Sequence, residues 1–176
     1  MQRDKDKTIR IAITGPESTG KSELAKTLAQ HYSTLWVPEY AREYLENIHR
    51  PYNEDDILLI AKEQKIREDK TLRMAKRFLF CDTEALVTKI WSIVKYGHCD
   101  PWILDQINSN PHDLYLLCNI DLPWEEDPLR EHPDKREYLF NLYVNELKVN
   151  KLPYGLVSGF GVNRLQNAIN IIEQAF

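Results

Sequence analysis

The sequence contains little cysteine, and the cysteines that are present exclude a disulfide framework. Its 176 residues include only Cys81, Cys99 and Cys118, an odd number of widely separated positions without C-x-x-C spacing. Cys81 and Cys118 lie in apolar runs typical of strands, where a cysteine behaves as a small buried side chain. We therefore expect buried free thiols and a cytoplasmic location, in which thiols stay reduced.

Long apolar runs and strong net charge are also absent. No stretch approaches the roughly 18 apolar residues that a membrane helix needs, and residues 1–7 are too charged for a signal peptide. A net charge of −4 argues against a nucleic-acid partner bound by bulk electrostatics. These absences argue against nucleic acid or a membrane as partner, and they leave the oligomeric state open.

The length and composition are those of an ordinary globular domain. With 43% hydrophobic and 28% charged residues, the chain is long enough to bury a sizeable core. We predict one domain over residues 1–176, in which residues 1–7 form a loose tail.

One segment near the N-terminus matches the G-x-x-x-x-G-K-[ST] pattern of phosphate-binding loops: Gly15-Pro16-Glu17-Ser18-Thr19-Gly20-Lys21-Ser22. A β-branched run over residues 9–14 precedes it, and a helical pattern that includes Glu23 follows it. This strand–loop–helix context is what the motif requires, and it disfavours the alternative of a chance match in an ordinary turn.

The physical chemistry of this loop predicts a bound nucleoside triphosphate with Mg²⁺. Gly15 and Gly20 allow successive backbone N–H groups to point at phosphate oxygens, and the helix N-terminus adds its positive dipole end. Lys21 would reach the β- and γ-phosphates, and the Ser22 hydroxyl would bind Mg²⁺.

Strand and helix patterns alternate along the rest of the chain. Apolar runs predict strands at 9–14, 34–37, 78–82, 114–118 and 154–158. Helical patterns occupy 20–32, 39–48, 54–75, 83–96, 137–149 and 163–174. We predict an α/β fold, a P-loop kinase-like three-layer sandwich in which helices cover both faces of a five-stranded parallel sheet. The ligand-binding loops then lie at the carboxyl ends of the strands.

An acidic residue ends the third predicted strand. Asp82 follows the apolar run that starts at Phe78, which is the position of the second metal-binding acid of P-loop proteins. We expect Asp82 to hold Mg²⁺ through water. The alternative is a helix cap, since Asp82 is followed by a helical pattern, and both roles are compatible.

The segment after the second strand is the predicted acceptor side. Glu39 could accept the proton of a hydroxyl or hold a sugar, and Arg42, one helical turn later, could steady the transferring phosphate. Tyr40 and Tyr44 form an i, i+4 pair that could line a base pocket. An amphipathic helix with surface ion pairs and core tyrosines explains the segment equally well.

Two further segments complete the predicted site. Residues 121–136 are highly charged and predict a mobile lid that excludes water and supplies Arg130 and Arg136, although a solvated surface loop is the alternative. Trp124 would anchor this lid or line the ligand pocket. After the last strand, Arg164 could stack on the nucleotide base or cap the sheet edge.

These segments together resemble the ribosylnicotinamide kinase domain of NadR-type NAD-salvage proteins over residues 9–174. The resemblance is carried by residues 15–22, by Pro-Glu-Tyr-Ala-Arg-Glu-Tyr at 38–44, by Cys-Asp-Thr-Glu-Ala-Leu-Val-Thr-Lys-Ile-Trp at 81–91, by Asp-Leu-Tyr-Leu-Leu at 113–117 and by Leu-Pro-Trp-Glu-Glu-Asp-Pro-Leu-Arg at 122–130.

The resemblance implies transfer of the ATP γ-phosphoryl group to the 5′-hydroxyl of nicotinamide riboside, which yields nicotinamide mononucleotide. It places Glu39 and Arg42 at the riboside, with Asp82 at Mg²⁺ and the arginines on the lid. Pro38 replaces the tryptophan that some members carry before the glutamate, and Pro128 replaces a lid glycine, which should stiffen the lid. Lacking a His-x-Gly-His motif and room for further domains, this chain is expected neither to make NAD nor to bind operator DNA.

Two alternatives to this function remain open from the sequence. A kinase of another nucleoside or small metabolite would use the same ribose-binding groups and would differ only in its base pocket. A regulatory module that hydrolyses ATP slowly would release ADP without dependence on any small acceptor.

Overall fold

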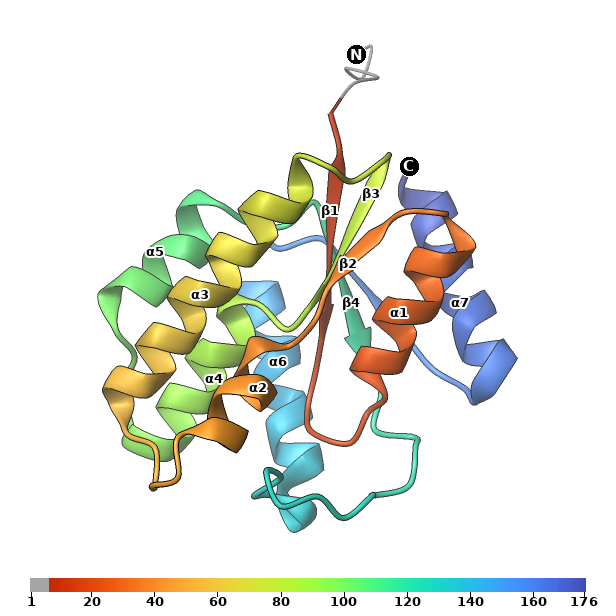
Figure 1. The fold of residues 1–176 in the computed structure, drawn as a ribbon. Coiled ribbons are helices and arrows are strands. Elements are labelled where there is room, and N and C mark those ends of the chain that lie inside the picture. The colour runs from red at the N-terminus through yellow and green to blue at the C-terminus, as the bar shows by residue number, and fades with distance from the viewer. Residues whose placement is uncertain (1–6) are drawn as a thin grey trace.

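The computed structural model describes residues 7–176, so residues 1–6 of the predicted tail lie outside the described part. A five-stranded sheet forms its centre, with the strands β1 (Ile9–Thr14), β2 (Leu35–Val37), β3 (Phe78–Asp82), β4 (Leu114–Cys118) and β5 (Tyr154–Val157). All pairings are parallel and the order is β2-β3-β1-β4-β5 (Figure 1). The predicted five-stranded parallel sheet is therefore confirmed.

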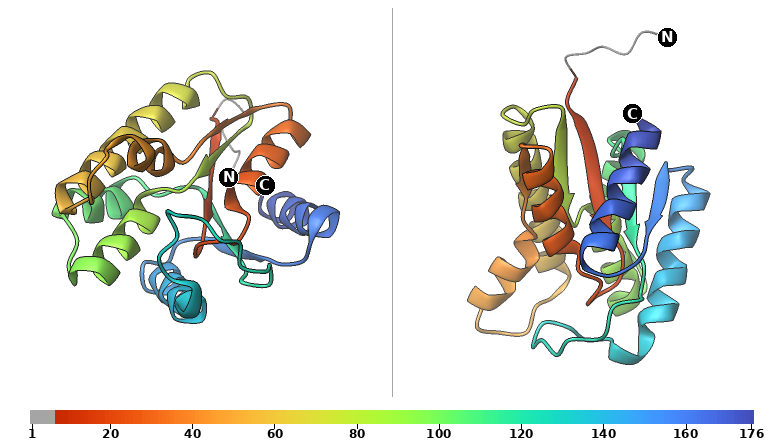
Figure 2. Two further views of the ribbon diagram at one scale, coloured as in Figure 1. Left: turned by 60° about the horizontal axis from the view of Figure 1, so that its bottom comes forward. Right: turned by 90° about the vertical axis from the view of Figure 1, so that its right-hand side faces the viewer.

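Helices cover both faces of this sheet. The helices are α1 (Lys21–His31), α2 (Tyr40–Asn47), α3 (Glu54–Leu72), α4 (Ala85–Tyr96), α5 (Pro101–Ser109), α6 (Arg136–Val149) and α7 (Gly161–Ala175), and a 3₁₀ turn spans Pro133–Lys135. One core cluster joins the sheet to α1 and α7, and a second joins it to α4 and α6. Figure 2 shows these two layers from other directions, with α1 and α7 on one side and α3, α4 and α5 on the other.

The apolar runs of the central strands have a direct structural cause. Every residue of β3 and β4 is buried, as expected for strands that are covered on both faces. Alternate side chains serve different layers: Phe78 and Phe80 pack with α1, while Leu79 and Cys81 pack toward α3.

One helix, α5, was not predicted from the sequence. It is short, but its start carries clear signals: Asp100 caps it by accepting a hydrogen bond from the Trp102 backbone N–H at 2.8 Å, and Pro101 occupies its first turn. Ile103 and Ile107 are its buried residues. Two buried positions give too little periodicity to identify a helix from pattern alone.

The topology brings the predicted functional segments to one edge of the sheet. The phosphate loop follows β1, Glu39 follows β2, Asp82 ends β3 and the lid follows β4. Because the strands are parallel, their carboxyl ends share this edge. No helix within residues 7–176 is both long enough and apolar enough to span a bilayer.

Candidate nucleotide and acceptor site

The phosphate loop adopts a backbone that only small residues allow. Gly15 has a φ of +130°, and a Cβ atom there would lie 3.0 Å from the Cys118 carbonyl oxygen. Gly20 has a φ of +71° and directly precedes α1. The Lys21 ammonium lies back over the loop and donates to the Pro16 carbonyl at 2.7 Å, as does the Thr19 hydroxyl at 2.8 Å. The loop is thus a preformed cradle at a helix N-terminus, suited to phosphate.

Arg164 supports this loop from behind. Its guanidinium is buried and donates to the Thr19 carbonyl at 2.8 Å, the Asn119 carbonyl at 3.1 Å and the Asp121 carboxylate at 2.7 Å. These bonds tie the first turn of α7 to the phosphate loop and to the end of β4. Arg164 therefore makes its hydrogen bonds to the protein itself, which fits the alternative that it caps the sheet edge.

Asp82 provides a buried carboxylate beside the loop. It is 1% exposed, and neither carboxylate oxygen has a hydrogen-bond partner of regular geometry within the described residues. Burial and, secondarily, the nearby charge of Glu39 raise the pKa of Asp82 to about 6, while Ser22 and Lys21 oppose the rise. The Asp82 carboxylate is thus buried beside the loop without a regular hydrogen bond among the described residues, an arrangement that fits a cation.

Glu39 and Arg42 face the loop across a cavity. Glu39 is the N-cap residue of α2 and Arg42 lies in its first turn, so both project from the end of β2. The Arg42 guanidinium donates to the Asp127 carboxylate of the lid at 2.9 Å. The predicted proximity of both residues to the phosphate loop is therefore present in the structure, and Arg42 additionally contacts the lid.

The cavity measures about 790 Å³ and is lined by both polar and apolar groups. The polar lining includes residues 15–23 together with Glu39, Arg42, Arg130 and Glu131, and the apolar lining includes Leu45, Ile48, Val87, Ile90 and Trp91. The Trp91 indole N–H donates to the Tyr52 hydroxyl at 3.0 Å, with ring centroids 5.0 Å apart, and both oxygens of the Glu131 carboxylate lie 3.0 Å from that hydroxyl. Such a volume accommodates a nucleotide-sized ligand set.

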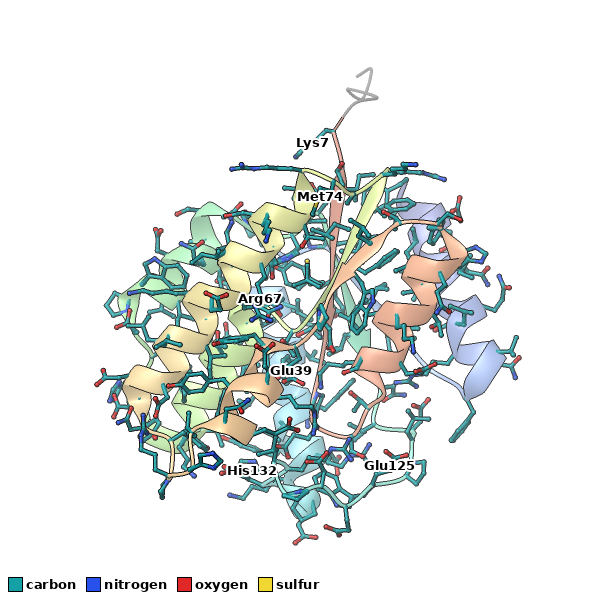
Figure 3. The ribbon with its side chains drawn as sticks, viewed as in Figure 1. Lys7, Glu39, Arg67, Met74, Glu125 and His132 are labelled. Carbon is teal, nitrogen blue, oxygen red and sulfur yellow. The ribbon has the colours of Figure 1, made fainter. Side chains whose placement is uncertain are left out.

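The lid, residues 121–136, passes below the carboxyl ends of the strands, where Glu125 and His132 mark it in Figure 3. The phosphate loop itself holds it there. The Glu17 carboxylate accepts the backbone N–H groups of Glu131 at 3.2 Å and His132 at 3.1 Å, and the Ser18 hydroxyl accepts the Glu125 N–H at 2.9 Å. The lid therefore lies closed against the nucleotide loop.

The two predicted lid arginines differ in position. Arg130 lines the cavity, and its guanidinium lies 3.3 Å from the Ser18 hydroxyl. Arg136 donates instead to the carbonyls of Leu122 at 2.9 Å and Ser18 at 3.0 Å, and it is absent from the residues that line the cavity. Arg130 is thus available to a ligand, while Arg136 bridges lid and loop.

Three aromatic residues of the sequence prediction lie away from the cavity lining. The Tyr40 ring packs beneath the Arg67 guanidinium at 4.2 Å, and the Tyr44 hydroxyl donates to Asp56 at 2.6 Å. Trp124 lies within the lid, 6.0 Å from the Arg130 guanidinium. The aromatic residues that line the cavity include Tyr52 and Trp91 instead.

Sequence reasoning missed Tyr52 and Trp91 as cavity residues. Tyr52 follows Pro51 in the connection between α2 and α3, and Trp91 lies in the middle of α4. Only the position of Trp91 one and a half turns into the helix that follows Asp82 could have signalled its approach to the site.

The sheet order, the loop and the buried acid at the end of β3 define a P-loop nucleotide-binding protein of the kinase-like type. A family model described as an AAA domain matches residues 10–164, and the chain belongs to this family.

Two curated relatives indicate which type of P-loop protein the chain resembles. The chain is 29% identical to the trifunctional NAD biosynthesis/regulator protein NadR of Salmonella typhimurium over 152 residues, and equally to that of Escherichia coli over 153 residues. Each match covers 82% of this chain and 37% of the relative, so the chain spans little more than a third of their length. The predicted resemblance to NadR-type proteins is confirmed.

Solved structures support the same fold. A NadR protein in complex with NR matches with a TM-score of 0.78 and 20% identity, covering 96% of this chain and 51% of that one. A NadR protein in complex with NAD and AMP-PNP gives a TM-score of 0.75 at 19% identity, covering 96% and 50%. A deoxyadenosine kinase from M. mycoides matches with a TM-score of 0.66 at 14% identity, covering 94% and 100%.

Proposed function

We propose that this chain is an ATP-dependent kinase that transfers the γ-phosphoryl group to the 5′-hydroxyl of nicotinamide riboside and so produces nicotinamide mononucleotide. The observation that carries the proposal is one cavity lined by the phosphate loop, by Glu39 and Arg42 and by the aromatic pair Tyr52 and Trp91. The similarity to NadR proteins, one of which is solved with NR, selects nicotinamide riboside among the ribosides that such a cavity suits.

The nucleotide occupies the part of the cavity lined by the phosphate loop in this proposal. Residues 15–23 cradle the phosphates, and Lys21 leaves the Pro16 carbonyl to bind them. The oxygen atoms of Ser22 and Asp82 form a donor set of the kind that Mg²⁺ prefers, and the unpartnered carboxylate of Asp82 fits a cation. Bound Mg²⁺ would neutralise the phosphate charge that develops during transfer.

The riboside occupies the remainder of the cavity. Its base lies against Tyr52 and Trp91, and its ribose lies beside α2. Glu39 accepts the proton of the 5′-hydroxyl as that oxygen attacks the γ-phosphorus, because its carboxylate lines the cavity at the start of α2, beside Arg42. Arg42 steadies the transferring phosphoryl group, and Tyr40 supports Glu39 from the adjacent position of α2.

The lid completes the site. Arg130 reaches the phosphoryl oxygens, while Arg136, Trp124 and Arg164 act indirectly by shaping the lid and the phosphate loop. Closure over the loop excludes water, which would otherwise compete with the riboside for the γ-phosphoryl group.

A second candidate is a kinase of another nucleoside, favoured by the structural match to deoxyadenosine kinase. The experiment that separates the two measures kcat/KM for nicotinamide riboside, cytidine, uridine and thymidine under Mg-ATP. We expect nicotinamide riboside to exceed the other acceptors by at least tenfold. An equal or higher kcat/KM for another nucleoside would make that nucleoside the acceptor in place of nicotinamide riboside. A rate of ADP release that does not depend on any acceptor would favour the slow ATPase.

The aromatic lining of the cavity supplies a matched pair of variants for the same assay. Trp91→Leu should raise the KM for the preferred riboside more than the KM for ATP, because the indole lines the cavity from the middle of α4 and not from the phosphate loop. Trp102→Leu, which changes a tryptophan of α5 outside this cavity, should leave both KM values unchanged.

A further inference from the structure

A second cluster of reactive side chains lies in the core, away from the nucleotide cavity. Glu68 comes from α3, Cys81 from β3 and His112 from the segment before β4, and all three are buried. One ligand atom of each, a carboxylate oxygen, a thiol sulfur and a ring nitrogen, lies within 4.8 Å of the other two. The proposed phosphate transfer uses none of these residues.

The strand register explains why these residues meet. Cys81 pairs with Ala12 on β1, and Ala12 pairs in turn with Tyr115 on β4, so the three lie in one row across the sheet. The His112 ring packs edge-on against the Tyr115 ring at 5.6 Å. Ala12, the smallest side chain of the row, leaves space between Cys81 and His112, and α3 delivers Glu68 over that space.

One buried polar atom of the cluster is left without a hydrogen bond by the protein. The His112 Nε2 atom is buried and makes no hydrogen bond within the described residues, although a Glu68 oxygen lies 3.3 Å away. The side chains of His112 and Glu68 are only 6% and 3% exposed. Buried ionisable groups are normally hydrogen-bonded, paired or bound to a metal ion.

A small cavity adjoins the cluster. It holds about 20 Å³ and is lined by Glu68 and His112 together with the half-buried Lys65, Gln106 and Asn110. That volume accommodates one water molecule, and the half-buried residues give the cavity a route toward the surface.

We propose that Glu68, Cys81 and His112 bind a transition-metal ion, with Zn²⁺ as the best match, and that a water molecule in the adjoining cavity completes four-coordination. A thiolate, an imidazole and a carboxylate are all established Zn²⁺ ligands. Binding replaces the Cys81 S–H bond by a sulfur–metal bond, and the proton leaves to solvent.

The site differs from the magnesium site in both place and chemistry. Cys81 and Asp82 are consecutive in β3 and therefore point to opposite faces of the sheet. The donors proposed for Mg²⁺, Ser22 and Asp82, are oxygen atoms, whereas the buried cluster contains a thiol. The inference is independent of the proposed kinase activity, since it requires no turnover.

The test is the absorption spectrum of the full chain, produced in cobalt-supplemented, zinc-depleted medium and measured with excess Mg²⁺. Thiolate ligation of Co²⁺ gives a charge-transfer band in the near ultraviolet, which an oxygen-only site cannot give. We expect this band at one Co²⁺ per chain, and one Zn²⁺ per chain when zinc is supplied.

Variants assign the ligands. Cys81→Ser should abolish the charge-transfer band, and Glu68→Gln and His112→Gln should reduce the bound metal severalfold. Cys118→Ser is the matched control, because Cys118 is also buried in the sheet but belongs to no cluster of metal-ligating side chains among the described residues. The charge-transfer band should persist in this variant.

A metal-free wild-type protein without a thiolate band under cobalt loading would overturn the proposal, and the cluster would then be a metal-free pair of Glu68 and His112. A band that survives Cys81→Ser would also overturn it. If the variants fail to fold, the metal content and spectrum of the wild-type protein decide the question alone.

Discussion

At the scale of single residues, the site depends on charges held close together before any ligand binds. Lys21 interacts with the loop carbonyl of Pro16, and Asp82 is buried beside Glu39. A cation would bind the Asp82 carboxylate, and a polyphosphate would bind the Lys21 ammonium in place of the Pro16 carbonyl. The charges of this site are therefore complementary to a metal–nucleotide complex.

Replacing the loop lysine tests this complementarity. Lys21→Ala should lower kcat by roughly 100-fold or more, the scale that is typical for a lost electrostatic stabiliser of the transition state. Lys26→Ala, an exposed lysine on the same helix, is the matched control and should retain full activity. Steady-state kinetics of both variants check this, and an unchanged rate for Lys21→Ala would contradict the phosphate-binding role.

The role of Glu39 is tested in the same way. Glu39→Gln removes the proton acceptor and should reduce kcat by about 100- to 10,000-fold at saturating riboside. Glu43→Gln is the control, because Glu43 lies on the same helix but pairs with Arg67 outside the cavity. A near-normal kcat for Glu39→Gln would transfer the role of general base to Glu17 or Asp82.

At the scale of elements, the connection between α2 and α3 positions Tyr52 in the cavity. Asp56 organises this connection: it accepts both Arg50 guanidinium nitrogens at 2.7 and 2.8 Å and forms a capping box with Asn53 at the start of α3. Its carboxylate therefore fixes the backbone on both sides of Tyr52.

The stability contribution of Asp56 should depend on pH. The Arg50 guanidinium holds the pKa of Asp56 well below its ordinary value. A lowered pKa in the folded state stabilises the fold above the ordinary pKa, and this contribution is lost as the pH falls toward the lowered value. Asp56→Asn should cost about 2 kcal/mol of unfolding free energy at neutral pH, and the difference from wild type should shrink in acid.

Urea denaturation at several pH values measures this effect. Asp55→Asn is the control, since Asp55 is exposed in the same helical turn and should change stability little at any pH. A cost for Asp56→Asn that stays constant between neutral and acidic pH would contradict the proposed ion pair.

The elements were largely predictable because their signals are local. Strand β1, the phosphate loop and α1 follow from consecutive residues, and Gly97 ends α4 in a left-handed conformation as its position predicts. The failure was α5, whose Asp100–Pro101 start is clear but whose two buried residues give no repeating pattern. Local chemistry thus predicts elements well when they are long or contain glycine and proline signals.

At the scale of the whole molecule, the site depends on contacts that sequence spacing does not reveal. Glu39, Arg42 and Arg130, which the motifs predict as site residues, line one cavity in the structure. The aromatic pair of this cavity has no signal in the motifs, because Tyr52 and Trp91 meet only when α4 packs beside the start of α3. Pairings of this kind result from tertiary packing, which a motif does not contain.

The lid contact is another property of the whole molecule. Glu17 belongs to the phosphate loop by motif, yet its carboxylate binds the backbone of the lid more than 100 positions later. The nucleotide loop is thereby coupled directly to lid closure.

Breaking this contact should raise ATP hydrolysis relative to phosphoryl transfer to the riboside. Glu17→Ala removes the acceptor of two lid N–H groups, so water should enter and ADP release without riboside should rise severalfold relative to riboside-dependent turnover. Glu23→Ala, at the cavity margin on α1, is the control because no hydrogen bond of its side chain to the lid is found among the described residues. An unchanged ratio of hydrolysis to transfer in Glu17→Ala would exclude the lid contact from the control of water.

Phosphoryl transfer from ATP to a riboside can be measured by following the phosphate itself. The wild-type chain is incubated with ATP labelled at the γ-phosphate, Mg²⁺ and nicotinamide riboside, and the label is traced after separation of the products. We expect label in nicotinamide mononucleotide in an amount equal to the ADP formed. Label that appears only as inorganic phosphate, at a rate that does not depend on the riboside, would contradict it.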